Sequence, residues 1–302
     1  MSLELKVSII IVNYNTKELL RNCLKSVYAQ TKDIDFEVIV SDNGSKDGSV
    51  EMIKSEFPAV ILIENDANLG FGAANNKGLD IAKGKYIFYL NSDTLLLNNA
   101  VKLFYDFWEN AKNKDEIGCL GCILKDKDFS DTHSGGSFPT YKSICKWQLN
   151  KNIVHFIKSF SKLFKLQRLY LNIKTKKNSE IFSYAPGKID YITGADLFLR
   201  NNSFARFDER FFMYYEETDL QLTMKKNGYQ SFLIDSPKII HFYKKDDKTF
   251  KISSFSDIFS QNSAIIYSKK NLSTKAYLLR FLISFDWLNP YIWKIRKNIC
   301  PK

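Results

Sequence analysis

Polar side chains follow three apolar segments of this chain, each at the point where the apolar run stops. The first run stops at Asn13-Tyr14-Asn15, the second at Asp42 and the third at Asn91-Ser92-Asp93. Amide and carboxylate groups of this kind can contact a nucleotide or hold a hard divalent cation. Because ligands of parallel sheets bind beyond the carboxyl ends of the strands, we expect these three clusters to meet in one crevice.

Three groups of residues in the second half of the chain could complete such a site. The acidic run Glu216-Glu217-Thr218-Asp219 opens a predicted helix, Thr193-Gly194-Ala195-Asp196 lies in a strand region, and His241 ends a strand candidate. Gly194 permits close backbone approach to a ligand. Structural roles compete with each assignment, because a helix dipole favours acidic residues in its first turn and an aspartate can simply cap a turn.

The segments between the first clusters alternate between strand and helix. Strands are predicted over residues 7–12, 36–40, 60–63 and 86–90, and amphipathic helices follow the first three of them. Strands of continuous apolar character that alternate with helices indicate a parallel sheet covered on both faces. The sequence therefore predicts an α/β fold.

The order of elements changes after residue 117. Strand regions are predicted over 117–124, 189–200 and 232–241, a helix within 211–226, and a helical, aromatic and basic tail after about 254. Residues 151–177 interleave apolar side chains with lysines, which predicts an amphipathic basic helix. Such a helix can lie on a membrane surface or pack on the core with its lysines in solvent.

Size, charge and cysteine content limit the class of protein. The chain has 302 residues, 45% of them hydrophobic, and a formal net charge of +11, which favours an anionic partner. Five scattered cysteines argue for a reducing compartment, and Cys119-Leu-Gly-Cys122 has no second pair to complete a zinc site, so buried strand cysteines are expected. With no signal peptide and no run of roughly 20 apolar residues, a soluble or peripheral protein is predicted.

Five short segments follow one another in order along the chain. They are Val7-Ser8-Ile9-Ile10-Ile11-Val12-Asn13-Tyr14-Asn15, Val40-Ser41-Asp42-Asn43-Gly44-Ser45, Asn68-Leu69-Gly70-Phe71-Gly72, Leu90-Asn91-Ser92-Asp93-Thr94 and Phe211-Phe212-Met213-Tyr214-Tyr215-Glu216-Glu217-Thr218-Asp219-Leu220. With these segments, residues 7–241 resemble the family 2 glycosyltransferases, particularly the rhamnosyltransferase branch. The resemblance implies a GT-A fold with a Rossmann-like, mostly parallel sheet, a nucleotide-binding half at 1–117, an acceptor-binding half at 118–250 containing the basic insertion near 150–177, and a helical extension at 251–302.

The resemblance implies roles in donor binding. Asp42 is expected to contact the nucleobase, because a carboxylate can accept the N3–H of uracil or thymine. Asp93 is expected to hold Mg²⁺ or Mn²⁺ on the donor diphosphate, with Asn91 in place of a first carboxylate and His241 as a second metal ligand. The residues predicted to bind nucleotide or donor are Val12, Asn13, Tyr14, Asn15, Asp42, Asn68, Gly70, Phe71, Asn75, Asn91, Ser92 and Asp93.

The resemblance also implies an inverting, in-line displacement at the anomeric carbon. Glu217 takes the position of the general base, with glutamate replacing the family's usual aspartate, and Asp219 is the second candidate. The expected partners are a dTDP- or UDP-sugar, a glycan or lipid-linked acceptor and an anionic membrane surface, in the cytoplasm at the inner face of the cell membrane, with no nucleic acid. The predicted acceptor-binding residues are Gly194, Ala195, Asp196 and Glu216.

Two other classes of protein compete with this interpretation. Asn91 and Glu217 depart from the family pattern, which leaves open an inactive nucleotide-sugar-binding protein of the same fold. A dinucleotide-dependent oxidoreductase is suggested by Gly70-Phe71-Gly72, but that loop lacks the third glycine and follows the third strand rather than the first.

Overall fold

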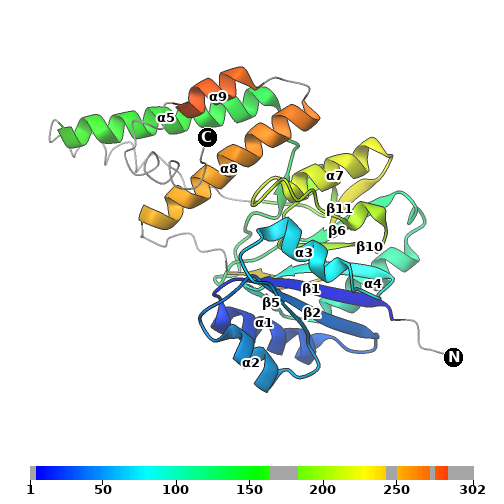
Figure 1. Ribbon diagram of the computed structural model, residues 1–302. Helices are drawn as coiled ribbons and strands as arrows, with labels where there is room; N and C mark the ends of the chain where they lie inside the picture. Colours follow the sequence, from blue (N-terminus) through cyan, green and yellow to red (C-terminus); the bar gives the residue numbers. More distant parts are fainter. Residues whose placement is uncertain (1–4, 164–182, 243–249, 273–275, 285–302) are drawn as a thin grey trace. The chain divides into compact units, whose positions relative to one another are not determined.

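Two units make up the chain in the computed structural model, which describes residues 5–163, 183–242, 250–272 and 276–284 (Figure 1). Unit 1 consists of Met1–Phe138, Phe182–Phe212 and Glu216–Lys244. Unit 2 consists of Pro139–Ile181, Met213–Tyr215 and Lys245–Lys302. This division joins the middle of the sequence to its C-terminal part, while the predicted domain boundary at residue 250 stays a prediction.

An eight-stranded sheet forms the centre of unit 1, in the order β3-β2-β1-β4-β10-β6-β11-β8. The pairs β3–β2, β2–β1, β1–β4 and β6–β11 are parallel, while β10 runs antiparallel to both β4 and β6, and β8 antiparallel to β11. The predicted mostly parallel sheet is therefore confirmed. Its strands are β1 (Val7–Asn13), β2 (Phe36–Asp42), β3 (Ile61–Glu64), β4 (Tyr86–Asn91), β6 (Ile117–Cys122), β8 (Gly187–Ile189), β10 (Asp196–Arg200) and β11 (Gln230–Ile234).

Two of the predicted strand regions each contain more than one strand in the structure. The region 189–200 contains β9 (Tyr191–Ile192) and β10, separated by the Thr193-Gly194-Ala195 segment. The region 232–241 contains β11 and β12 (Ile239–His241). Two small sheets result, in which β12 pairs with β5 (Thr94–Leu96) and β7 (Gly135–Gly136) pairs with β9. The first of these brings His241 opposite Thr94, next to Asp93.

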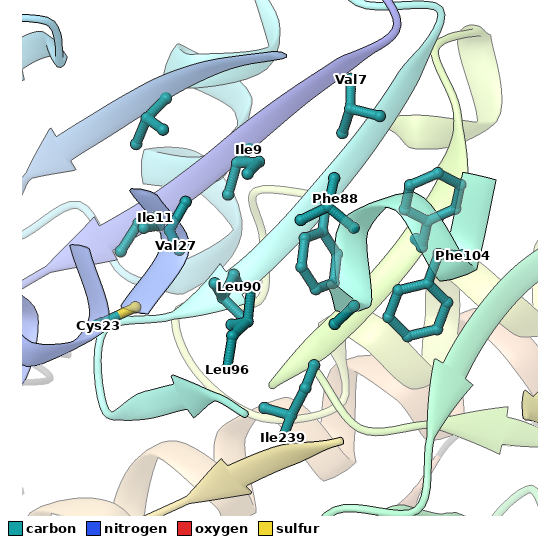
Figure 2. Close-up of a cluster of buried hydrophobic side chains, with 14 of the residues drawn as sticks. Val7, Ile9, Ile11, Cys23, Val27, Phe88, Leu90, Leu96, Phe104 and Ile239 are labelled. Atoms are coloured by element: carbon teal, nitrogen blue, oxygen red, sulfur yellow. The ribbon is translucent and has the colours of Figure 1, made fainter. Parts of the chain in front are cut away.

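Helices cover both faces of the sheet because side chains of a strand alternate between its faces. Ile9 and Ile11 of β1 belong to one buried cluster with Phe88 and Phe104 (Figure 2), whereas Ile10 belongs to a second cluster with residues of α7. The helices of unit 1 are α1 (Lys17–Gln30), α2 (Ser49–Glu56), α3 (Phe71–Leu79), α4 (Ala100–Asn110), the 3₁₀ turn η1 (Ser203–Ala205) and α7 (Glu216–Lys226).

Cys119 and Cys122 lie in β6 and are fully buried. Burial raises the pKa of both thiols well above their ordinary value, so both stay protonated at neutral pH. The prediction of buried strand cysteines is thereby confirmed for this pair.

The described residues of unit 2 form the helices α5 (Tyr141–Leu163), α8 (Phe250–Asn271) and α9 (Tyr277–Ser284). The helix predicted over 151–177 begins ten residues earlier than expected, at Tyr141, and its part beyond Leu163 falls outside the described residues. Among the described residues, no helix has the length and apolar character needed to cross a membrane.

Candidate active site

Asp42, at the end of β2, holds the loops that follow the first two strands. One carboxylate oxygen accepts a hydrogen bond from the Asn13 side chain at 2.7 Å, and the other accepts from the backbone N–H of Ser45 at 2.8 Å. The side chain is only 1% exposed. Each carboxylate oxygen can accept more than one bond, so the predicted contact with a nucleobase stays a prediction alongside this structural role.

A chain of hydrogen bonds continues from Asp42 to the loop after β4. Asn13 also accepts a bond from the Thr16 hydroxyl at 2.6 Å, and the Thr16 hydroxyl lies 3.0 Å from that of Ser92. Asp42, Asn13 and Ser92 therefore come together at one edge of the sheet, as the sequence predicts. Thr16, which was not among the predicted site residues, connects Asn13 to Ser92.

Asn15 and the exposed Tyr14 lie at the outer side of this edge. Asn15 adopts a left-handed backbone conformation with φ of 54°, donates its N–H to the Ser45 hydroxyl at 2.8 Å and accepts from the N–H of Lys46 at 2.8 Å. The Tyr14 ring is 48% exposed. Val12, half-buried, pairs with Asn91 across β1 and β4. An exposed aromatic ring on a fixed loop is available to pack against a flat ligand.

The loop between β3 and α3 is fixed by amide side chains. Asn43 donates to the side chain of Asn68 at 3.2 Å and to the carbonyl of Gly70 at 3.1 Å, and Asn68 in turn accepts from the N–H of Gly70 at 3.0 Å. Gly70 has φ of 88°, and a Cβ there would lie 2.3 Å from the carbonyl oxygen of Phe212. Only glycine fits this position. Asn75 is buried and bonds the carbonyl of Phe71 within α3.

Asp93 and His241, the two predicted metal ligands, are neighbours. The Asp93 carboxylate lies 3.3 Å from Nε2 of His241, and the Asn91 amide nitrogen lies 3.5 Å from the same atom. The backbone carbonyl of Asp93 accepts the N–H of Phe242 at 2.9 Å, which fixes the strand β12 beside the loop. Strand β12 therefore positions the histidine, 148 residues further along the sequence, beside the carboxylate.

The segment predicted to bind the acceptor lies against the same edge. The N–H of Asn91 donates to the carbonyl of Ala195 at 3.0 Å. A Cβ on Gly194 would lie 3.2 Å from the Phe71 ring and 4.0 Å from Cβ of Glu217. Gly194 is therefore the point at which the donor loop, the acceptor segment and the start of α7 approach one another.

Asp196, which is predicted to contact the acceptor, is fully buried. One of its carboxylate oxygens accepts the N–H of Cys122 at 2.7 Å, and the other has no hydrogen-bond partner among the described residues. Burial raises the pKa of this carboxyl to about 8, so it is largely protonated at neutral pH. In this conformation the carboxyl cannot be reached by a sugar, and its predicted contact with the acceptor stays a prediction.

Glu217 lies in the first turn of α7 beside Gly194. Burial raises the pKa of its carboxyl to about 7, and the backbone N–H groups of Glu217 and Thr218 oppose this shift only in part. A base with a pKa near the working pH is suited to proton transfer. Glu216 and Asp219 are buried, at 4% and 2% exposed. Glu217 is half-buried and is therefore the most accessible of the three acidic residues, which agrees with its predicted role.

Gln221, one turn after Glu217, connects α7 to two strands. Its side-chain oxygen accepts from the N–H of Ile192 at 2.9 Å and from the Ser231 hydroxyl at 2.9 Å, while its amide donates to the carbonyl of Ile192 at 2.7 Å. The side chain is 1% exposed. Gln221 therefore holds the helix that carries Glu217 against β9, which leads into the Gly194 segment.

We expect Gln221→Leu to lower the free energy of unfolding by about 2–4 kcal/mol, because it leaves the N–H and C=O of Ile192 buried without partners. Urea unfolding monitored by circular dichroism measures this change. Lys226→Leu, on the exposed part of the same helix, should change the free energy by less than about 0.5 kcal/mol and serves as the control. If Gln221→Leu lowers the free energy of unfolding no more than Lys226→Leu does, Gln221 does not hold α7 against β9.

A separate hollow of unit 1 lies toward the other end of α7. Residues of β8, β11 and the C-terminal turn of α7 line it, and Lys225 pairs with Asp190 at 2.6 Å on its wall. Gln221 and Ser231, which are bonded to each other, lie in this lining, but none of the residues predicted to bind donor, acceptor or metal is part of it. The predicted site is therefore the strand edge described here and not this hollow.

The chain matches the sequence profile of Glycosyl transferase family 2 over residues 8–166, just over half of its length. A poly(ribitol-phosphate) beta-glucosyltransferase from Bacillus spizizenii is 34% identical over 121 residues, which is 38% of this chain and 19% of that protein. An N-acetylglucosaminyl-diphospho-decaprenol L-rhamnosyltransferase from Mycobacterium tuberculosis is 24% identical over 249 residues, 77% of this chain and 75% of that protein. Across three of the curated relatives, the match spans only 19%, 28% and 39% of the relative's own length.

Among solved structures, a mannosyltransferase from Pyrobaculum calidifontis in complex with GDP-Man and Mn²⁺ aligns with a TM-score of 0.57. The two sequences are 13% identical, and the alignment covers 100% of this chain and 77% of that chain. At this identity the likeness concerns the fold alone, and it confirms the predicted GT-A architecture.

Proposed function

The chain belongs to glycosyl transferase family 2, and from this premise we propose that it is an inverting, metal-dependent glycosyltransferase of the hexosyltransferase type. It moves a sugar from dTDP-rhamnose or a UDP-sugar to a glycan or lipid-linked acceptor in cell-surface polysaccharide synthesis. The proposal draws on the names of two relatives, which transfer glucose to poly(ribitol phosphate) and rhamnose to a diphospho-decaprenol. A membrane-bound acceptor of this kind agrees with a protein that works at the inner face of the membrane.

One observation carries the proposal: hydrogen bonds connect the predicted nucleotide residues to the loop that holds Asp93. Asp42, Asn13, Thr16 and Ser92 form this connected series at the ends of β1, β2 and β4. A nucleoside diphosphate extends from a base to two phosphates, so its binding requires such a continuous, fixed edge. The hydrogen bond from Asn91 to Ala195 supports the proposal further, because the segment proposed to bind the acceptor then lies next to the loop proposed to bind the phosphates.

Glu217 acts as the general base in the proposed reaction. Its carboxylate takes the proton of an acceptor hydroxyl, whose oxygen attacks the anomeric carbon of the donor sugar. The bond from that carbon to the diphosphate oxygen breaks on the opposite face, and the nucleoside diphosphate leaves with both electrons. The configuration is inverted because one displacement occurs. Gly194 lies beside Glu217, and a side chain there would press on the Phe71 ring.

Asp93 and His241 fit the divalent cation that this mechanism calls for. Neighbouring ligands of an octahedral cation bound at about 2.1 Å lie roughly 3 Å apart, and the Asp93 and His241 atoms are 3.3 Å apart. No cluster of three His, Cys, Asp or Glu side chains occurs among the described residues, which agrees with a cation that takes its remaining ligands from donor phosphates and water. When bound, the cation supplies positive charge that stabilises the leaving diphosphate.

We expect UDP or dTDP with Mn²⁺ to raise the melting temperature by roughly 5–10 °C at about 100 times the dissociation constant, and NAD to leave it unchanged. A thermal-shift series with UDP, dTDP, GDP and NAD, each with and without Mn²⁺, measures this directly. Asp42→Asn should lower the shift with UDP and dTDP, because the base loses its charged acceptor. Stabilisation by NAD alone would instead favour the oxidoreductase, and no response to any nucleotide would contradict the proposed donor site.

A further inference from the structure

The short helix α9 of unit 2 has apolar side chains on both of its faces. Leu279, Leu282 and Ile283 are buried, on the side where α9 packs with α5 and α8 (Figure 1). The other face carries Tyr277, Leu278 and Phe281, which are 67%, 52% and 59% exposed. With 100° of rotation per residue, these three side chains fall within a sector of about 100°. They form one apolar strip, named here the α9 strip.

The α9 strip is larger than packing within the unit requires. Three buried residues already anchor this helix of eight residues to its neighbours. Three large apolar side chains that are exposed side by side cost free energy, and polar residues at the same positions would avoid this cost. Contiguous exposed apolar surface marks a site of contact with a membrane or a partner.

The charges near the α9 strip identify its partner. Helices α5 and α9 contain no aspartate or glutamate, and their exposed charged residues include Lys142, Lys146 and Arg280. The one acidic residue in α8, Asp257, is paired with Lys151 of α5 at 2.7 Å. The three helices therefore present positive charge that no carboxylate of their own neutralises.

Apolar insertion flanked by uncompensated lysine and arginine is the combination that an anionic bilayer binds. We propose that the α9 strip inserts into the interface of an anionic membrane, with Arg280, Lys142 and Lys146 at the lipid headgroups. A nucleic acid would use the charges but not the strip, and a second copy of the chain would bring the same positive charges together. The inference deepens the proposed function, since the membrane is where a lipid-linked acceptor is found, but the surface shares no residue with the donor site.

Co-sedimentation of the full chain with vesicles tests the α9 strip. The wild type should bind phosphatidylglycerol–phosphatidylcholine vesicles at low salt. Its binding to pure phosphatidylcholine vesicles, and its binding to the mixed vesicles in high salt, should each be several-fold weaker. Leu278→Asp with Phe281→Asp should lower the partition coefficient at least about tenfold, because two apolar side chains no longer leave water. Lys142→Glu with Lys146→Glu should lower it about tenfold at low salt only.

The matched control is Phe129→Asp, which removes a side chain of unit 1 that is 64% exposed and should leave vesicle binding unchanged. Each variant is first compared with the wild type by circular dichroism and by the nucleotide-induced thermal shift, which should stay the same. Equal vesicle binding by the wild type and Leu278→Asp/Phe281→Asp overturns the proposal. It is also overturned if the wild type is a dimer and the double variant is a monomer, because the α9 strip then binds a second copy of the chain. If nucleotides do not raise the melting temperature of the wild type, this result counts against the donor site and not against the α9 strip.

Discussion

Glu217→Gln is expected to lower kcat for sugar transfer by about 10³-fold, because the amide cannot accept the proton of the acceptor hydroxyl. The side chain keeps its size and its place in the first turn of α7, so the affinity for the donor should change by less than about threefold. Transfer of a radiolabelled sugar measures kcat, and the nucleotide thermal shift measures donor binding. Loss of transfer with intact donor binding would exclude the inactive nucleotide-sugar-binding protein, since such a protein has no transfer to lose.

Three further variants make this test specific. Glu217→Asp restores the family's usual residue but shortens the side chain by one methylene, and roughly a tenfold loss is expected from the displaced carboxylate. Glu51→Gln, an exposed glutamate in the first turn of α2, should have no effect. Asp219→Asn should cost much less than Glu217→Gln. If Asp219→Asn abolishes transfer while Glu217→Gln retains it, the general base is Asp219.

The raised pKa of Glu217 has consequences for both activity and stability. Because the base acts in its deprotonated form, kcat/KM should rise about tenfold per pH unit below pH 7 and level off above it. The folded state holds this proton more tightly than the unfolded state between pH 4.5 and 7, so the free energy of unfolding should fall as pH rises through that range. Glu217→Gln removes this contribution and should be more stable than wild type at pH 8 by roughly 3 kcal/mol.

The buried Asp196 also makes the free energy of unfolding fall as pH rises, since the pKa of its carboxyl is raised too. The difference between wild type and Glu217→Gln isolates the contribution of Glu217, because Asp196 is present in both proteins. Urea unfolding at several pH values between 4 and 9 supplies the comparison, provided that each transition is two-state. A difference that does not change with pH would mean that Glu217 titrates normally in the folded chain.

Residues at strand ends are the ones whose place in the fold the sequence predicts well. Asp42, Asn91 and Asp93 end apolar runs whose period and length identify buried parallel strands, and parallel strands bring their carboxyl ends to one edge. The side-chain types then suggest the chemistry. No long-range information is needed for this step, whereas the sheet order β3-β2-β1-β4 depends on which distant strands pair and was not predicted.

Residues that act through distant partners leave no such signal. Thr16 meets Ser92 across 76 positions, and Gln221 meets Ile192 across 29, yet each is a single polar residue in or next to a helix. The antiparallel entry of β10 between β4 and β6 is likewise a matter of distant pairing. Tyr214 and Tyr215 adopt φ of 71° and 69° directly before Glu216, a conformation that aromatic residues rarely take and that local sequence does not indicate.

The metal site gives the second large effect, since Asp93→Asn should lower transfer by about 10³-fold or more and weaken Mn²⁺ binding in the presence of UDP. His241→Ala should cause a smaller loss, because the donor phosphates and Asp93 still hold the cation. Treatment with a chelator should stop transfer, and added Mn²⁺ should restore it. Electron paramagnetic resonance of Mn²⁺ reports binding without reliance on activity.

Asn91→Asp provides the converse test of the same site. A second carboxylate beside Asp93 and His241 adds negative charge where the cation binds, so Mn²⁺ affinity should increase by about tenfold. Asp66→Asn, at an exposed carboxylate elsewhere in unit 1, should leave both affinity and transfer unchanged. Because Asn91 lies 3.5 Å from His241 and next to the Asp93 loop, a tighter site in Asn91→Asp together with a weaker one in Asp93→Asn would locate the cation between these residues. Full transfer by Asp93→Asn in the presence of chelator would instead mean that the leaving diphosphate is stabilised without a cation.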